Sequence, residues 1–103
     1  MTEFQTRVYE AVKLVPRGKV ATYTRIGSIV GCGSARAVGQ ALKENPFSPQ
    51  VPCHRVIASD LSLGGFRGRI KGKALMDKKN MLQSEGVVFV RGKIADKGFL
   101  WRP

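Results

Sequence analysis

The sequence is poor in the residues that build metal sites and disulfide frameworks. Its 103 residues include one histidine and two cysteines. Cys32 and Cys53 are too few for a disulfide framework, so we expect two free thiols. A single histidine with no close Cys/His spacing excludes a four-ligand zinc site of the usual kind. We therefore expect no bound metal.

Long apolar runs and acidic residues are also scarce. No apolar stretch approaches the ~18 residues that a membrane-spanning helix needs, and residues 1–4 lack the features of a signal peptide. We expect a cytoplasmic protein, or a nuclear one if the source is eukaryotic. Asp and Glu number 7 against 18 Lys and Arg, which gives a formal charge of +11. Polyanions are the natural partners, with nucleic acid ahead of an anionic membrane surface.

The chain length leaves room for one domain, residues 1–103, with a modest core. Helical spacing of apolar residues predicts a first helix that Thr2 caps and Pro16 ends. A second segment over residues 23–30, a glycine-containing break and a helix over residues 35–43, capped by Ser34, form the outline of a helix-turn-helix. The predicted fold is mainly α with a small β component.

The second half of the chain carries weaker signals. Residues 55–58 predict a short strand, and residues 87–95 predict a hairpin that turns at Arg91 and Gly92. Between them, a helix is expected from Leu75 to Glu85, ended by Gly86. The face of that helix is defined by four residues, namely Leu75, Met76, Lys79 and Leu82.

Small residues dominate the helix over residues 35–43, so its surface could approach a groove wall closely. The alternative is that they are small to let the helix pack against its neighbours, but that alternative leaves Arg36 without a role. The basic charge around the helix favours docking on DNA. The small residues are Ala35, Ala37, Gly39 and Ala41.

The most specific motif is Pro52-Cys53-His54-Arg55-Val56. A reactive cysteine needs a proton acceptor or positive surroundings, and His54 and Arg55 supply candidates for both. Because neighbours on a strand point to opposite faces, a bend or a water must connect the sulfur to the imidazole. Glu85 is the carboxylate we choose to orient the ring. The alternatives are a small buried cysteine and a structural histidine.

The motif and its surroundings closely resemble the DNA-binding domain of O6-alkylguanine-DNA alkyltransferases. The shared features include Gly18-Lys19-Val20, Tyr23, the Ala35 to Gly39 stretch, Asn45-Pro46 and Ser84-Glu85-Gly86. The short chain and its Trp101-Arg102-Pro103 ending are similar to the alkyltransferase-like proteins, which usually carry tryptophan at the position of Cys53.

The resemblance implies a monomeric winged helix-turn-helix that binds the minor groove of double-stranded DNA and rotates an O6-alkylguanine into a pocket. Cys53 would take the alkyl group irreversibly, once per molecule and without a cofactor. His54 would remove the thiol proton through water, and Glu85 would hold His54. Tyr23 would contact a phosphate and protonate the departing guanine, and Asn45 would brace the turn before the cysteine.

The resemblance also implies a DNA-binding surface and a base pocket. Arg36 would fill the space that the base leaves. The other DNA-binding residues would be Tyr23, Ser34, Ala35, Ala37, Gly39, Gln40 and Lys43. The base pocket would be lined by Pro52, Val56, Phe66 and Arg67.

The loop over residues 64–68 departs from the family pattern, which often places a tyrosine and a small residue there. Phe66 lacks the tyrosine hydroxyl, and Arg67 adds charge and bulk. The sequence therefore does not determine the size of the base pocket. Arg67 could contact a phosphate instead of lining the pocket. Two other functions stay open as well. One is a lesion sensor that recruits excision-repair proteins without transfer, and the other is a winged-helix regulator.

Overall fold

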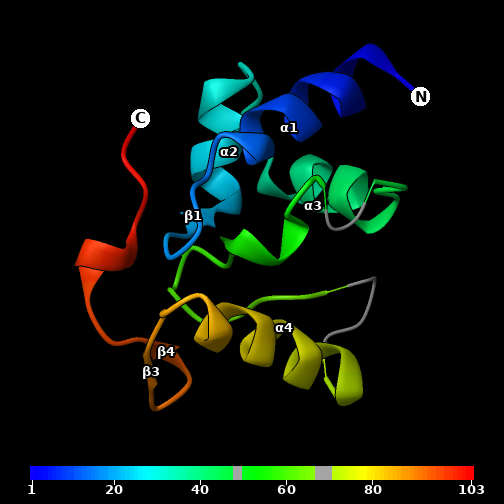
Figure 1. Cartoon of the computed structure of the whole chain (residues 1–103). Helices are drawn as coiled ribbons and strands as arrows, with labels where there is room; N and C mark the ends of the chain where they lie inside the picture. Colours follow the sequence, from blue (N-terminus) through cyan, green and yellow to red (C-terminus); the bar gives the residue numbers. More distant parts are fainter. Residues whose placement is uncertain (48–49, 67–70) are drawn as a thin grey trace.

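The fold is known from a computed structural model that describes residues 1–47, 50–66 and 71–103. The described part is helix-rich with two small sheets, which confirms the mainly α prediction (Figure 1). Of the described helices, none is both long and apolar enough to cross a membrane. The elements are α1 (Glu3–Lys13), β1 (Ala21–Thr22), α2 (Tyr23–Ile29), α3 (Ala35–Lys43), η1 (Cys53–Arg55), β2 (Val56–Ile57), α4 (Lys73–Ser84), β3 (Phe89–Val90), β4 (Lys93–Ile94) and η2 (Lys97–Phe99).

Side-chain caps begin the first three helices. The Thr2 hydroxyl accepts from the Gln5 backbone N–H and the Gln5 side chain accepts in return, which forms a capping box at α1. The Ser34 hydroxyl accepts from the Ala37 N–H at 3.1 Å and starts α3. Both predicted caps are confirmed. Thr22 caps α2 in the same way, a role that the sequence analysis missed.

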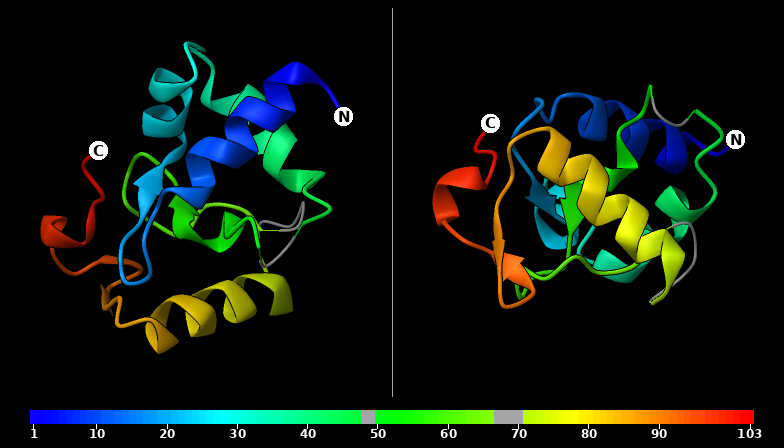
Figure 2. Two further views of the ribbon diagram at one scale, coloured as in Figure 1. Left: turned by 45° about the horizontal axis from the view of Figure 1, so that its top comes forward. Right: turned by 60° about the horizontal axis from the view of Figure 1, so that its bottom comes forward.

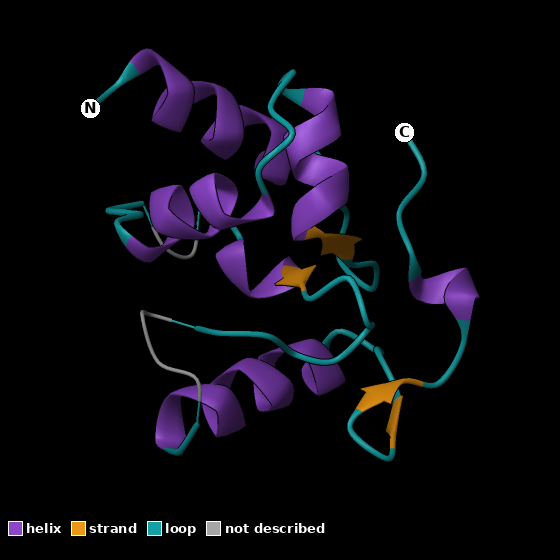
Figure 3. Ribbon diagram, turned by 180° about the vertical axis from the view of Figure 1, so that it is seen from behind, coloured by secondary structure: helices purple, strands orange, loops and turns teal. Residues whose placement is uncertain are grey.

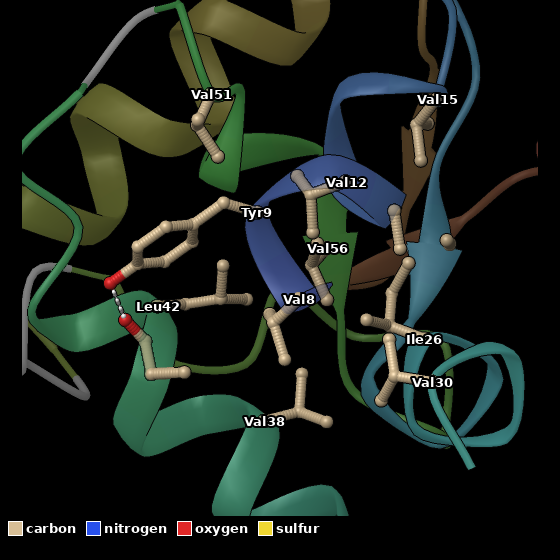
Figure 4. Close-up of a cluster of buried hydrophobic side chains, with 13 residues drawn as sticks. Val8, Tyr9, Val12, Val15, Ile26, Val30, Val38, Leu42, Val51 and Val56 are labelled. Carbon is tan, nitrogen blue, oxygen red and sulfur yellow. Dashed lines mark hydrogen bonds between the residues drawn. The ribbon is translucent and has the colours of Figure 1, made fainter. Parts of the chain in front are cut away.

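The main core lies between α1, α2 and α3 (Figure 4). Its apolar side chains include Val8, Val12, Ile26 and Val38, all fully buried. The Tyr9 hydroxyl donates to the Ala41 carbonyl oxygen at 2.6 Å, which ties α1 to α3. This core therefore fixes how α3 is presented to solvent.

A two-stranded parallel sheet joins the two halves of the chain. Ala21 of β1 pairs with Val56 of β2, and Thr22 pairs with Ile57. The two strands lie between α2 and α4 (Figure 3). Because they run parallel, η1, which directly precedes β2, and α2, which directly follows β1, lie at opposite ends of the strand pair. A strand of two residues has no apolar period to detect, so β1 was not predicted. The predicted strand over 55–58 is shorter than expected, because Arg55 belongs to the η1 turn.

The predicted hairpin is confirmed. Phe89 of β3 pairs with Ile94 of β4, and Val90 pairs with Lys93. The turn residues Arg91 and Gly92 both have positive φ, 53° and 80°. Positive φ at both central positions is what a tight hairpin turn requires, and glycine adopts it without strain.

Helix α4 exists, and Leu82 is fully buried as its predicted face requires, but the prediction was wrong for Met76 and Lys79. The helix begins at Lys73 rather than Leu75 and ends at Ser84, with Glu85 as its C-cap. Met76 is 65% exposed, whereas Lys78 is 0% exposed. Lys79 lies in solvent. A buried lysine on this face is possible because backbone carbonyls surround its ammonium group.

Candidate active site

Cys53 is a free, half-buried thiol at the first position of η1. Its backbone N–H donates to the Val51 carbonyl oxygen at 2.8 Å, and the Arg55 N–H donates to the Pro52 carbonyl oxygen at 2.9 Å. The motif therefore forms a helical turn at this point rather than a strand. The opposite-face argument for Cys53 and His54 does not apply to this geometry.

Asn45 contacts the backbone on both sides of the link that leads to Cys53. Its side-chain N–H donates to the Val51 carbonyl oxygen at 3.0 Å, and its side-chain oxygen accepts from the Phe47 N–H at 2.9 Å. The Val51 oxygen thus receives Asn45 as well as Cys53. Asn45 therefore lies where it would brace the turn that precedes Cys53.

His54 and Arg55 converge on one carboxylate, that of Glu85. His54 Nε2 lies 3.0 Å from Glu85 Oε2. Arg55 binds the same carboxylate in bidentate fashion, through Nε to Oε1 and Nη2 to Oε2, both at 2.9 Å, and also donates to the Val15 carbonyl oxygen. The structure therefore assigns Arg55 to Glu85, although the sequence offered it as a positive neighbour for the thiolate.

Burial and hydrogen bonding together set the charges of Glu85 and His54. Burial raises the pKa of Glu85, but hydrogen bonds from Arg55 and His54 outweigh it and hold the carboxyl pKa below its ordinary value. Burial lowers the pKa of His54 despite the opposing influence of Glu85. At neutral pH the imidazole is thus uncharged beside an ionised Glu85. Its Nε2 carries the proton that Glu85 accepts, which leaves Nδ1 as the basic nitrogen.

Lys78 is a site residue that the sequence analysis missed. Its ammonium donates to three backbone carbonyl oxygens, those of Val56 at 2.7 Å, Leu63 at 2.5 Å and Gly65 at 2.9 Å. Burial lowers its pKa to about 7, and the nearby Cys53 acts in the opposite direction. Lys78 therefore ties α4 to the strand after Cys53 and to the loop that contains Gly65.

Tyr23 stands at the start of α2 and faces the same loop. Its hydroxyl donates to the Gly65 carbonyl oxygen at 3.1 Å. Gly64 has a φ of +70°, and a Cβ at that position would lie 3.1 Å from the Tyr23 ring, so a larger residue would be strained there. Burial raises the pKa of Tyr23 to about 12, with Cys53 contributing in the same direction. The phenol is therefore protonated at neutral pH.

Three of the four residues predicted to line a base pocket are described. Pro52 is buried. The Val56 side chain is 0% exposed and lies in the core, so only its backbone faces Lys78. Phe66 is 4% exposed, with its ring centroid 5.9 Å from Lys78 Nζ. Arg67 lies outside the described residues.

The predicted DNA-binding residues of α3 all lie on its solvent-accessible surface. Arg36, Gln40 and Lys43 are exposed, and Ala35, Ala37 and Gly39 are partly exposed. Ala41 belongs to the core instead. A Cβ at Gly39 would meet no atom within 4 Å, so no neighbour within the described chain requires glycine there. Ser34 caps α3 at the edge of this surface.

Comparisons with known proteins agree with this arrangement. Residues 3–87 match the model of the 6-O-methylguanine DNA methyltransferase DNA-binding domain. The methylated-DNA–protein-cysteine methyltransferase of Methanothermobacter thermautotrophicus is 44% identical over 84% of this chain and 46% of its own length. The chain thus spans about half the length of such relatives.

Other matches extend over the whole chain. A DNA base-flipping protein of Vibrio parahaemolyticus is 35% identical over 100% of both chains. The crystal structure of S. pombe Atl1 with damaged DNA containing O6-carboxymethylguanine superposes with a TM-score of 0.85 at 37% identity, covering 100% of this chain and 98% of Atl1. With the family model matching most of its length, the chain belongs to the 6-O-methylguanine DNA methyltransferase DNA-binding domain family.

Proposed function

We propose that this protein repairs O6-alkylguanine in double-stranded DNA by transferring the alkyl group to Cys53. The observation that carries the proposal is a free Cys53 followed directly by a neutral His54, whose imidazole bonds the Glu85 carboxylate that Arg55 in turn holds in place. Relatives named as methylated-DNA–protein-cysteine methyltransferases support it.

DNA docking in this proposal uses the exposed surface of α3. Helices α2 and α3 act as a helix-turn-helix and the β3–β4 hairpin as its wing, with α3 in the minor groove. Arg36 fills the space of the extruded base, and the bare backbone at Gly39 lets the groove wall come close. The excess of 11 positive charges draws the chain to phosphates.

The chemical step is a direct displacement. The Cys53 proton passes through a water to His54 Nδ1, and the sulfur then attacks the alkyl carbon. The bond from that carbon to guanine O6 breaks, its electron pair stays on guanine, and Tyr23 supplies the proton that makes guanine neutral. His54 then releases its extra proton to solvent, and Tyr23 takes one up from solvent, so both side chains return to their starting protonation. The thioether persists, so each molecule reacts once and needs no cofactor.

A second candidate is lesion binding without transfer, which would then recruit excision-repair proteins. The observation in its favour is that two full-length matches are a protein named for base flipping and Atl1 bound to damaged DNA. The same docking surface serves both functions, and they differ only in the fate of Cys53.

The test is a mass spectrum of the Cys53 peptide after incubation with a duplex that contains O6-methylguanine. Transfer adds one methyl group to this peptide and none to the peptide of Cys32, the second free thiol. Cys53→Ala removes the product while duplex binding persists. A folded protein that binds the lesion tightly yet leaves Cys53 unmodified establishes the second candidate.

A further inference from the structure

A second concave surface lies beside the segment over residues 97–102, and none of the described residues of the candidate site lines it. It has a volume of about 510 Å³ and includes the Gly98 backbone. We call it the Trp101 groove. Its side chains are those of Pro16, Lys19, Lys97, Leu100, Trp101 and Arg102.

Hydrogen bonds hold the walls of the Trp101 groove together. The backbone N–H of Val20 donates to the Phe99 carbonyl oxygen at 2.8 Å, and the backbone N–H of Trp101 donates to the Val20 carbonyl oxygen at 2.7 Å. Lys19 Nζ reaches across to the Gly98 carbonyl oxygen at 2.5 Å. Trp101 also packs against the main core. The groove is therefore preformed, and a ligand would not have to order it.

The chemistry of the Trp101 groove combines an apolar floor with a cationic rim. Trp101 and Leu100 are half-buried, whereas Lys97 and Arg102 are exposed. Among the described residues that line the groove, none is acidic. Within the described parts of the chain, neither of these two exposed cations takes part in an ion pair. An anionic ligand thus meets free positive charge around an aromatic surface.

We propose that the Trp101 groove binds an acidic peptide segment of a partner protein, with an apolar side chain against Trp101 and carboxylates on Lys97 and Arg102. A peptide is favoured over DNA because α3, the helix that enters the groove in the proposed complex, lies on the opposite side of the molecule from this segment, and only the proposed wing, β3–β4, lies near it (Figures 1 and 2). The proposal does not depend on alkyl transfer, so it can fail while the proposed function stands.

The experiment uses the single tryptophan of the chain, Trp101, as its probe. The peptide Ac-Asp-Glu-Leu-Phe-Asp-Glu-NH2 is titrated into ¹⁵N-labelled protein, and the indole N–H resonance is followed by NMR. The control peptide carries Asn and Gln in place of Asp and Glu. A saturable shift with the acidic peptide alone, retained when an undamaged duplex saturates the protein, supports the proposal.

Matched charge variants separate a specific groove from general attraction. Lys97→Glu with Arg102→Glu should weaken peptide binding by about tenfold or more. Lys73→Glu with Lys79→Glu makes the same change of charge on exposed positions of α4 and should leave binding within about twofold. An unmoved indole resonance or equal losses in both variants overturns the proposal. So does displacement of the peptide by the duplex, which makes the groove a DNA contact.

Discussion

Tyr23 and Lys78 donate hydrogen bonds to the same carbonyl oxygen, that of Gly65, at 3.1 and 2.9 Å. One residue comes from α2 and the other from α4, so the loop after β2 is held from two sides at Gly65. In the proposed reaction Tyr23 gives its proton to guanine and leaves this oxygen. Lys78 keeps the oxygen paired during that step, and the loop stays in place.

Lys78→Met should destabilise the protein strongly. The change keeps a long side chain but removes the Lys78 donor from three carbonyl oxygens, of which that of Gly65 keeps its bond from Tyr23, at a cost of about 2–4 kcal/mol in the free energy of unfolding. Urea denaturation measures it. Lys79→Met, the next residue on the exposed face, is the matched control and should stay within about 0.5 kcal/mol of the parent. Equal effects of the two changes would show that the three bonds contribute nothing.

Glu85→Gln should lower stability and slow alkyl transfer together. The change leaves Arg55 without a charged partner, which costs about 3 kcal/mol at neutral pH. Because the carboxyl pKa lies below its ordinary value of 4.5 in the folded protein, its contribution is present above that pH. It is lost as the pH falls through the lower folded-state pKa.

Denaturation curves of the parent and Glu85→Gln at several pH values test this dependence. The gap between the two stabilities should close below about pH 4.5. Glu10→Gln changes an exposed carboxylate of α1 and should leave stability and transfer unchanged. A gap that is constant with pH contradicts an ionised Glu85 in this role.

Alkyl transfer should withstand mild acid before it falls. Burial lowers the pKa of His54 below its ordinary value of 6.5, so the imidazole still accepts a proton at that pH. The single-turnover rate should decline only when the pH drops further, as His54 becomes protonated and loses its basic Nδ1. Rates on O6-methylguanine DNA across the pH range, with binding measured in parallel, give the profile. A rate that declines already above pH 6.5 would exclude His54 as the base.

Arg36→Ala should reduce lesion recognition more than general DNA affinity. Arg36 is exposed on α3, and in the proposed complex it occupies the space of the extruded base. Affinities for matched duplexes with and without O6-methylguanine measure the difference. Lys43→Ala removes another exposed charge from the same helix and should weaken both duplexes alike. If Arg36→Ala also weakens both equally, Arg36 is an ordinary phosphate contact.

Local signals in the sequence predicted much of the fold but not all of the site. The capping hydroxyls of Thr2 and Ser34 and the apolar spacing were enough for α1 and α3. The Glu85 carboxylate does meet His54, yet its choice rested on residue type, because the two are separated by 31 positions. Arg55 competes for the same carboxylate, which adjacency to Cys53 did not reveal.

Lys78 shows the limit of pattern reasoning most clearly. A lysine on an amphipathic helix is usually exposed, so Lys78 was not considered for the buried face of α4. Spacing alone placed Met76 and Lys79 on that face together with Leu75 and Leu82. The three carbonyls that make burial of Lys78 possible come from residues 13 to 22 positions away along the chain. Only the folded loop brings these oxygens together.

Stoichiometry tests the central claim most directly. The protein is titrated into a fixed amount of O6-methylguanine duplex, and the remaining lesion is counted after each reaction has stopped. Transfer to Cys53 predicts the loss of one lesion per protein molecule, after which the reaction ends. A lesion count that stays constant at saturating protein, or that keeps falling beyond one equivalent, contradicts it.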